Sequence, residues 1–395
     1  MREPEKITEN HDILEPCRTM VIGVGGGGVH AVSHMRGVWT EGPDLVAVHT
    51  DGKMLNDSKV ARKIQIGAGI TNGMGCAGDP MTGKRAAQAD YPLVRELFTN
   101  VDLAFIVTTL GGGTSTGAAP VIAQVAREEG VMCLCVVSMP FAFEGEEKQR
   151  VAQGGLDRLI TCSDAVICMP NERLVEQMGA WKSLAHALKR ADAELAAGLK
   201  ALWMLFRQTG IIHLDLSDVR KLVEHDSHYC VLAIGEATGK EKAKSAVQAL
   251  LKHPVLEGGK QLTRTTGIMV GIMGGTDLTL AEVNDVVGAI SEATSGNVRL
   301  MVGAGAEKGE RNHLTVVVLA AEKRPEPVSE EKEPAPEPEK TSAGKPRGRK
   351  QPKQESLVFD QPGRGRFKGV EPTYYEGEDL DIPTFIRRGI RLKDR

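Results

Sequence analysis

Two glycine-rich segments, residues 23–28 and 111–117, carry the clearest chemical signal in the sequence. Each follows an apolar run typical of a β-strand and precedes a helical pattern. Glycine lets the backbone approach a phosphate without a Cβ clash, and a helix N-terminus offers unpaired N–H groups and a favourable dipole. Turns from two strands of one sheet are expected to converge. They would wrap a triphosphate, with hydroxyls from Thr114, Ser115 and Thr116.

Other interpretations of these glycines are weaker. Gly23, Gly25 and Gly28 satisfy G-x-G-x-x-G, which alone would suit a dinucleotide-dependent oxidoreductase equally well. A Rossmann fold, however, has one such turn and not two. Neither segment contains the G-K-[ST] of a P-loop ATPase, and a flexible hinge does not explain why both turns follow strands.

Two acids three residues apart, Asp215 and Asp218, precede another predicted helix. They could cap that helix. They could also orient and polarise a water molecule in phosphoryl transfer, which needs mainly positioning and charge stabilisation.

The pattern of apolar residues predicts an α/β protein with a doubly wound, parallel-sheet nucleotide-binding domain and a smaller α+β domain after it. The 395 residues, 41% hydrophobic, suffice for both. A stretch rich in Pro, Glu, Lys and Arg then predicts a disordered linker. The expected parts are a polar arm (1–17), the nucleotide-binding domain (18–227), the α+β domain (228–322), the linker (323–377) and a partner-binding peptide (378–395).

Composition narrows the class of protein further. The net charge of -3 gives no reason to expect nucleic-acid binding. The seven cysteines have no zinc-finger spacing and are expected to be free thiols in a reducing cytosol. The polar N-terminus is unlike a signal peptide, and no apolar run approaches the roughly 18 residues of a membrane span. A cytoplasmic protein is therefore expected.

Taken together, the motifs resemble those of the tubulin/FtsZ family. GGGTSTGAAP resembles the family signature G-G-G-T-[GS]-[TS]-G, and VIGVGGGGVHAVSHM resembles the first FtsZ loop. VSMPFAFEGEEK, MPNERL and HLDLSDV resemble further family segments, in the right order. LDIPTFIRR resembles the FtsZ C-terminal peptide, so the tail favours the FtsZ branch.

The resemblance implies a GTPase that polymerises head to tail into the filaments of the bacterial division ring, in the cytoplasm at the division site. Its active site would be completed between subunits. GTP/GDP and Mg²⁺ would be its cofactors. Its partners would be other copies of itself and, through the tail, a membrane tether or division regulator. A non-hydrolysing FtsZ-like scaffold is the alternative; a dinucleotide-dependent oxidoreductase is less favoured.

The resemblance also implies roles for individual residues. Phosphates would be held by Gly25, Gly26, Gly27, Gly28, Gly111, Gly112, Gly113, Thr114, Ser115, Thr116 and Gly117. Asp51 would lie near the γ-phosphate and act indirectly on Mg²⁺, beside a γ-phosphate-sensing loop with Gly75, Cys76 and Ala77. Glu144 would hold the ribose, and Asn171 and Asp192 would recognise guanine. Asp215, Asp218 and His213 would be catalytic. The partner-binding side chains would be Leu380, Ile382, Pro383, Phe385, Ile386 and Arg387.

Several positions depart from the family pattern. His30 replaces an Asn near the base, Leu188 replaces an aromatic residue that stacks on guanine, and Lys148 replaces an Arg that holds the nucleotide. Further departures are Ser115, His49 and His213. Losing an aromatic stack weakens base binding by roughly 1 kcal/mol. We therefore expect retained but slow GTP hydrolysis.

Overall fold

The computed structural model describes residues 17–169, 183–207, 211–223, 229–294, 298–306, 311–322, 374–375 and 378–379. The chain divides into two compact units, Met1–Pro327 and Val328–Arg395. In the second unit, β11 (Tyr374–Tyr375) pairs antiparallel with β12 (Glu378–Asp379). The predicted arm (1–17) lies outside the described residues except for Cys17, and so do the predicted partner-binding residues Leu380, Ile382, Pro383, Phe385, Ile386 and Arg387.

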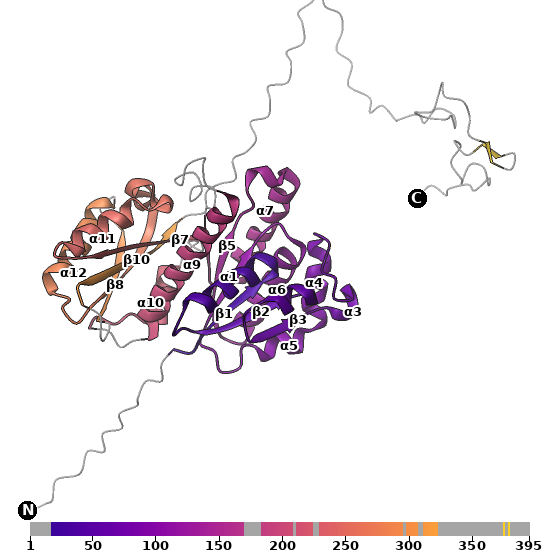
Figure 1. Cartoon of the computed structure of the whole chain (residues 1–395), viewed down its shortest axis with the longest axis horizontal. Helices are drawn as coiled ribbons and strands as arrows, with labels where there is room; N and C mark the ends of the chain where they lie inside the picture. The colour runs from indigo at the N-terminus through magenta and orange to yellow at the C-terminus, as the bar shows by residue number, and fades with distance from the viewer. Residues whose placement is uncertain are drawn as a thin grey trace, which may run out of the picture. The chain divides into compact units, whose positions relative to one another are not determined.

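The first unit is built on one ten-stranded sheet (Figure 1). Its strands are β1 (Thr19–Val24), β2 (Asp44–His49), β3 (Arg62–Gln65), β4 (Leu103–Thr109), β5 (Met132–Ser138), β6 (Ala165–Met169), β7 (Tyr229–Thr238), β8 (Thr265–Gly274), β9 (Arg299–Ala306) and β10 (His313–Glu322). Their order is β3-β2-β1-β4-β5-β6-β7-β10-β8-β9. The pairs from β3 to β7 are parallel, whereas β10 runs antiparallel to both β7 and β8. The expected parallel sheet followed by a smaller α+β part is confirmed.

A short pairing joins the two parts of this sheet. β6 and β7 meet at only two residue pairs, Val166 with Tyr229 and Ile167 with Cys230. The nucleotide-binding part therefore continues into the α+β part without a break in the sheet.

Helices cover both faces of the sheet. They are α1 (Gly25–Val38), α2 (Gly52–Asp57), α3 (Ala68–Thr71), α4 (Pro80–Ala89), α5 (Tyr91–Glu96), α6 (Gly113–Glu128), α7 (Glu146–Cys162), α9 (Leu184–Arg207), α10 (Leu216–Leu222), α11 (Lys242–Leu251) and α12 (Leu280–Ala293), with 3₁₀ segments η1 (Ala142–Glu144) and η2 (Pro254–Arg264). Residues of α1 and α9 pack in one buried cluster, and residues of α6 and α7 in another.

Alternation within the strands explains this two-sided core. In β1, Val21 belongs to the cluster with α1 and α9, whereas its neighbours Met20 and Ile22 belong to the cluster with α6 and α7. Successive side chains of a strand point to opposite faces, so a run that is apolar throughout predicts burial on both. In Figure 1, α9 runs between the two parts of the unit, and its cluster includes Met169 of β6 and Val317 of β10.

Candidate functional site

The two glycine-rich turns lie side by side because they follow β1 and β4, which are neighbours in the sheet. They also touch: a Cβ built on Gly25 would lie 2.7 Å from Ser115 Cβ. Gly25 has a φ of +75°, a conformation that disfavours any residue with a side chain. The N-termini of α1 and α6 therefore meet at the carboxyl ends of β1 and β4, an arrangement suited to an anion.

The first helix begins earlier than the sequence predicted. We expected α1 to start near Val29 after a glycine loop, but it starts at Gly25. A Cβ on Gly27 would lie 2.1 Å from Thr109 Oγ1, and one on Gly28 would lie 2.3 Å from the Val107 carbonyl oxygen. The glycines thus let the first helical turn pack directly against β4.

The hydroxyls of the second turn make contacts within the protein. Thr114 Oγ1 lies 2.7 Å from Thr50 Oγ1, and Ser115 Oγ donates to the Gly112 carbonyl at 3.1 Å. Thr116 is fully buried, and its hydroxyl accepts the Gly111 N–H at 2.8 Å. Thr116 therefore helps to shape the turn, and its expected contact with a phosphate stays a prediction. The backbone N–H groups remain the main candidate donors to an anion.

A third loop closes the same edge of the sheet. Gly75, Cys76 and Ala77 lie between α3 and α4, and Cys76 Sγ is 3.3 Å from Thr50 Oγ1. Asp51 forms an antiparallel bridge with Met74 in this loop. The predicted γ-phosphate-sensing loop therefore lies against both Asp51 and the second glycine-rich turn.

Asp51 caps α2 with one carboxylate oxygen. Its Oδ1 accepts the Lys53 and Met54 N–H groups at 2.8 and 3.3 Å, and its own N–H donates to His49 Nδ1 at 2.7 Å. Burial lowers the pKa of His49, which favours the neutral imidazole that this acceptor role requires. These contacts leave Asp51 Oδ2 for water or an ion.

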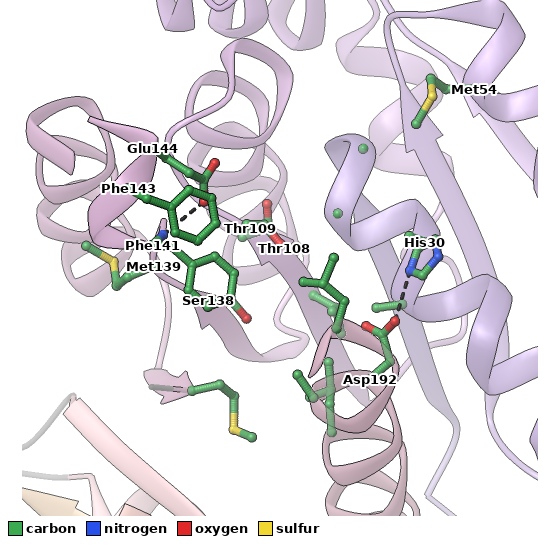
Figure 2. Close-up of a pocket in the computed structure, with 18 residues that line it drawn as sticks. His30, Met54, Thr108, Thr109, Ser138, Met139, Phe141, Phe143, Glu144 and Asp192 are labelled. Atoms are coloured by element: carbon green, nitrogen blue, oxygen red, sulfur yellow. Dashed lines mark hydrogen bonds and ion pairs between the residues drawn. The ribbon is translucent and has the colours of Figure 1, made fainter. Parts of the chain in front are cut away.

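A cavity of about 490 Å³ extends from the first turn to the start of α9, a size typical of small-molecule sites (Figure 2). Figure 2 shows His30 and Asp192 on one wall, and Phe141, Phe143 and Glu144 on the other. Its lining comprises Gly26, Gly27, His30, Ala31, Met54, Val107, Thr108, Thr109, Ser138, Met139, Phe141, Phe143, Glu144, Met169, Leu188, Ala191, Asp192 and Leu195. The cavity therefore gathers predicted residues from segments far apart in the sequence.

Asp192 has the chemistry of a base-recognising group. His30 Nδ1 lies 2.9 Å from its Oδ2, but Oδ2 is buried and accepts no well-aligned hydrogen bond from the described residues. Burial raises the pKa of Asp192, with the nearby His30 and His34 opposing that shift. A buried carboxylate is costly unless its acceptor positions are filled, so Asp192 is suited to a ligand that brings further N–H groups. Asn171 lies outside the described residues.

Glu144 and Lys148 form a pair on the opposite wall. Burial of Glu144 raises its pKa, but the hydrogen bonds from Lys148 and from the Phe141 N–H prevail and lower it below its ordinary value. Lys148 also reaches the second turn, since a Cβ on Gly111 would lie 2.8 Å from Lys148 Cγ. Lys148 thus lies between Glu144, which is predicted to hold the ribose, and the second glycine-rich turn, which is predicted to hold phosphates.

Sequence reasoning missed the aromatic pair on this wall. The rings of Phe141 and Phe143 stack with centroids 5.2 Å apart and planes 11° from parallel. Both lie in the segment VSMPFAFEGEEK, so the signal was present in a motif that we assigned only through Glu144. Leu188 also lines the cavity, and the aromatic surface of the site therefore comes from a different segment.

The predicted catalytic loop lies at the other end of the sheet. Ile212 exchanges two backbone hydrogen bonds of 3.0 Å with Ala304 of β9, and the buried Leu214 packs against Gly303. His213 and Asp215 on either side of Leu214 are exposed. This loop is thus fixed to β9, away from the two turns that follow β1 and β4.

Asp215 and Asp218 cap α10 reciprocally. Asp215 Oδ1 accepts the N–H groups of Ser217 and Asp218 at 2.7 and 3.1 Å, and Asp218 Oδ2 accepts the Asp215 N–H at 3.2 Å. Hydrogen bonding from Ser217 lowers the pKa of Asp215. The carboxylate therefore stays ionised at neutral pH and is suited to attract and orient water.

Comparisons with known proteins define the class. The family described as "Tubulin/FtsZ family, GTPase domain" matches residues 18–179, and "FtsZ family, C-terminal domain" matches residues 229–323. A cell division protein FtsZ of Pseudomonas aeruginosa is 36% identical over 309 residues, covering 78% of each chain. One of Aquifex aeolicus is 34% identical over 311 residues, covering 79% of this chain and 84% of that protein.

Solved structures agree with these sequence matches. An FtsZ dimer of M. jannaschii aligns with a TM-score of 0.70 and 32% identity, covering 78% of this chain and 89% of that one. CetZ2 of Haloferax volcanii, at 21% identity and a TM-score of 0.63, shares the fold. The fold and the paired turns are thus those of a tubulin-class GTPase. Within that class, the chain belongs to the FtsZ family: it is a cell-division GTPase that binds GTP and polymerises.

Proposed function

We propose that this GTPase hydrolyses GTP in a site that two copies complete when they pack head to tail. One copy contributes the nucleotide cavity and the other the loop with Asp215. Strand order is the observation that carries this proposal: β4, which leads into the second turn, and β9, which holds the loop, are separated by six strand spacings. At about 4.8 Å for each spacing, the two halves lie roughly 29 Å apart. A single copy cannot bring its own Asp215 to its own nucleotide.

Within the cavity, each wall contacts a different part of GTP. The N–H groups at the starts of α1 and α6 bind the phosphates. Asp192 accepts the N1–H and N2–H of guanine, a donor pair that adenine lacks, and Glu144 accepts a ribose hydroxyl. A carboxylate has about four acceptor positions, so Glu144 can accept this bond while it keeps those from Lys148 and Phe141.

The residues near the phosphates also fit a magnesium ion bound mainly by GTP and water. Mg²⁺ in nucleotide sites keeps several waters and uses few protein carboxylates. Where the structure describes the chain, no group of three His, Cys, Asp or Glu side chains is placed to hold a metal. Asp51 Oδ2 is the candidate acceptor for a magnesium-bound water, because Oδ1 caps α2. The ion would neutralise phosphate charge, while Asp51 would fix the water's orientation.

Exposed apolar side chains at both ends support head-to-tail packing. Met54 and Phe143 of the cavity lining are exposed, Phe143 at 71%, and so is Met74 in the loop that pairs with Asp51. Ile212 and Leu280 are exposed at the end with the catalytic loop, Leu280 at 73%. Two different apolar surfaces at opposite ends suit a heterologous contact that repeats into an open filament.

The C-terminal residues 378–395 are proposed to bind a membrane tether or division regulator and so bring the filaments to the division site in the cytoplasm. Their acidic start, apolar centre and following arginines match a peptide that folds into a groove on a partner. Among the described residues, the helices are all too short or too polar to cross a membrane. A Phe385→Ala chain should lose tether binding and keep polymerisation.

Mixing two inactive variants tests the shared site. Gly26→Asp places a carboxylate among the phosphate-binding N–H groups, and Asp215→Ala removes the water-orienting acid. Each variant alone should release little phosphate from GTP. In a mixture, the intact cavity of one meets the intact loop of the other, so turnover should exceed the sum of the separate rates. Wild-type specific activity should also rise steeply above a threshold protein concentration.

Two outcomes would contradict the proposal. If the mixture stays as inactive as its components although both variants are folded, the site is not shared. If wild-type specific activity is independent of protein concentration down to the nanomolar range, a single copy suffices.

A further inference from the structure

Lys242 is a buried cation at an unfavourable place. It is the first residue of α11, and its side chain is only 3% exposed. Burying an ammonium group costs solvation free energy, and the positive end of the helix dipole repels it. The side chain is therefore retained only because something in the fold compensates for both effects.

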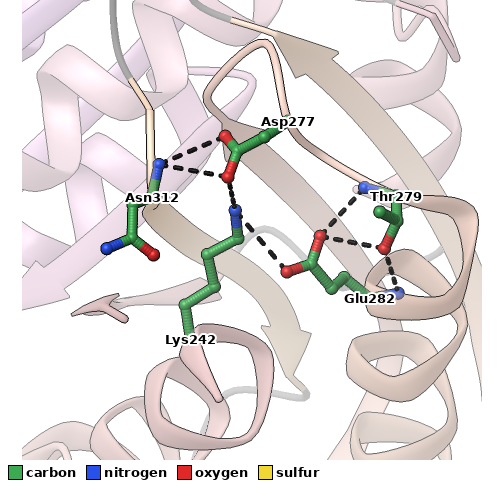
Figure 3. Close-up of polar contacts among 5 residues, drawn as sticks. All are labelled: Lys242, Asp277, Thr279, Glu282 and Asn312. Carbon is green, nitrogen blue, oxygen red and sulfur yellow. Dashed lines mark hydrogen bonds and ion pairs between the residues drawn. The ribbon is translucent and has the colours of Figure 1, made fainter. Parts of the chain in front are cut away.

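Two carboxylates from the β8–α12 region provide this compensation (Figure 3). Lys242 Nζ lies 2.6 Å from Asp277 Oδ2 and 3.5 Å from Glu282 Oε1. The hydrogen bond that Lys242 donates to Asp277 raises the pKa of Lys242 and lowers the pKa of Asp277. The three charges form one connected network.

Both acids make further contacts that hold loops in place. Asp277 accepts the backbone N–H of Asn312 at 3.1 Å, just before β10. Glu282 caps α12 through Thr279, whose N–H and hydroxyl both donate to it (Figure 3). The network thus ties together the start of α11, the turn before α12 and the entry to β10.

The same end of the sheet carries the catalytic loop. Among the described strands, β9 pairs with β8 alone, and the last pair between them is Gly274 with Ala306. Ile212 is bonded to Ala304, two residues before that pair. The turn that contains Asp277 begins directly after Gly274. The position of the catalytic loop therefore depends on the end of β9, which pairs with the end of β8. The turn that follows β8 is the one that Lys242 holds through Asp277.

We propose that Lys242 is a positioning residue for the half of the GTPase site that each copy offers to the next. It acts through Asp277 and Glu282 on the end of β8, and through β9 on the loop with Asp215. This inference rests on the proposed shared site. It predicts that losing the cation impairs the loop side of a copy and leaves its nucleotide cavity intact.

Full-length Lys242→Met tests this prediction. The apolar side chain keeps much of the volume and removes the charge. GTP affinity should stay within about twofold of wild type because the cavity lies on the other part of the sheet. GTP turnover should fall roughly tenfold or more, since small displacements of catalytic groups have effects of that size. Lys244→Met is the matched control: this lysine lies on the same helix, is exposed, and should leave both quantities unchanged.

Mixing experiments then separate positioning from general destabilisation. Lys242→Met mixed with Gly26→Asp should regain turnover, because Gly26→Asp supplies an intact loop to an intact cavity. Lys242→Met mixed with Asp215→Ala should not, since both variants lack a working loop. Asp277→Asn should behave as Lys242→Met does, and it decides the question if Lys242→Met does not fold.

Each other result overturns the inference. Wild-type turnover of Lys242→Met shows that the cation positions nothing. Weakened GTP binding, or failure to regain turnover with Gly26→Asp, shows a general structural role. The mixture of Gly26→Asp with Asp215→Ala tests the shared site by itself. If that mixture does not regain GTP turnover, the shared site is wrong. If it does, and Lys242→Met mixed with Gly26→Asp does not, only the positioning role of Lys242 is wrong.

Discussion

Replacing Gly26 by aspartate tests whether the start of α1 holds a phosphate. A Cβ at this position would make an ordinary van der Waals contact, since its nearest neighbour, Met54 Cε, is 3.5 Å away. The fold should therefore tolerate the new side chain. With the carboxylate about 5 Å from a phosphate charge and an effective dielectric constant of about 20, the repulsion is about 3 kcal/mol. GTP binding should weaken by about 100-fold.

Isothermal titration with GTP and with guanosine measures this effect directly. Guanosine carries no phosphate, so its affinity should be nearly the same for Gly26→Asp and wild type. Gly26→Asn is the matched control, because it has the same size without the charge and should lose less than about tenfold in GTP affinity. Equal weakening by Asp and Asn would refute the electrostatic reasoning. Undiminished GTP affinity of Gly26→Asp would refute the phosphate site at this turn.

Three further predictions concern the base, the chemistry and assembly. Asp192 must be ionised to accept guanine N–H groups, and burial raises its pKa. As the pH is lowered, GTP affinity should therefore begin to fall at a pH above the ordinary aspartate pKa of about 3.9. The GTP affinity of Asp192→Asn should not show this fall. Asp215→Ala should lower phosphate release roughly 100-fold, while fluorescence titration shows unchanged GTP affinity; retained turnover would contradict its role. Leu280→Glu should raise the protein concentration needed for sedimentable filaments roughly tenfold, given the free energy of burying a leucine, whereas Val38→Glu, exposed on α1, should not.

The strands and both phosphate turns were predictable because their signals are local. Apolar runs fixed β1 and β4, and the glycines marked where each strand meets its helix. β3 carries no such local signal: its sequence RKIQ is mostly exposed and polar, and it forms a strand by pairing with β2. Tertiary pairing overrides local preference at such an edge.

The details of the site depended on contacts between distant segments. No local pattern indicates that the Thr116 side chain is buried within the second turn or that Oδ2 of Asp192 is buried. The sequence also did not show that His30 and Asp192, 162 positions apart, approach within 2.9 Å. The approach of His30 to Asp192 comes from how α9 packs beside α1, which no local pattern encodes.

The sequence left two interpretations of Asp215 open, helix capping and catalysis, and the structure makes them compatible. Both capping bonds go to Oδ1, so Oδ2 is not used by them. Capping fixes the side chain at the first turn of α10 and keeps it ionised, which are the two conditions that a water-orienting acid must meet. The structure therefore contains a positioned acid that lies roughly 29 Å from the phosphate turns of the same copy. If this acid orients the attacking water, as proposed, hydrolysis requires a neighbour, and the rate of GTP turnover should report how many contacts between copies have formed.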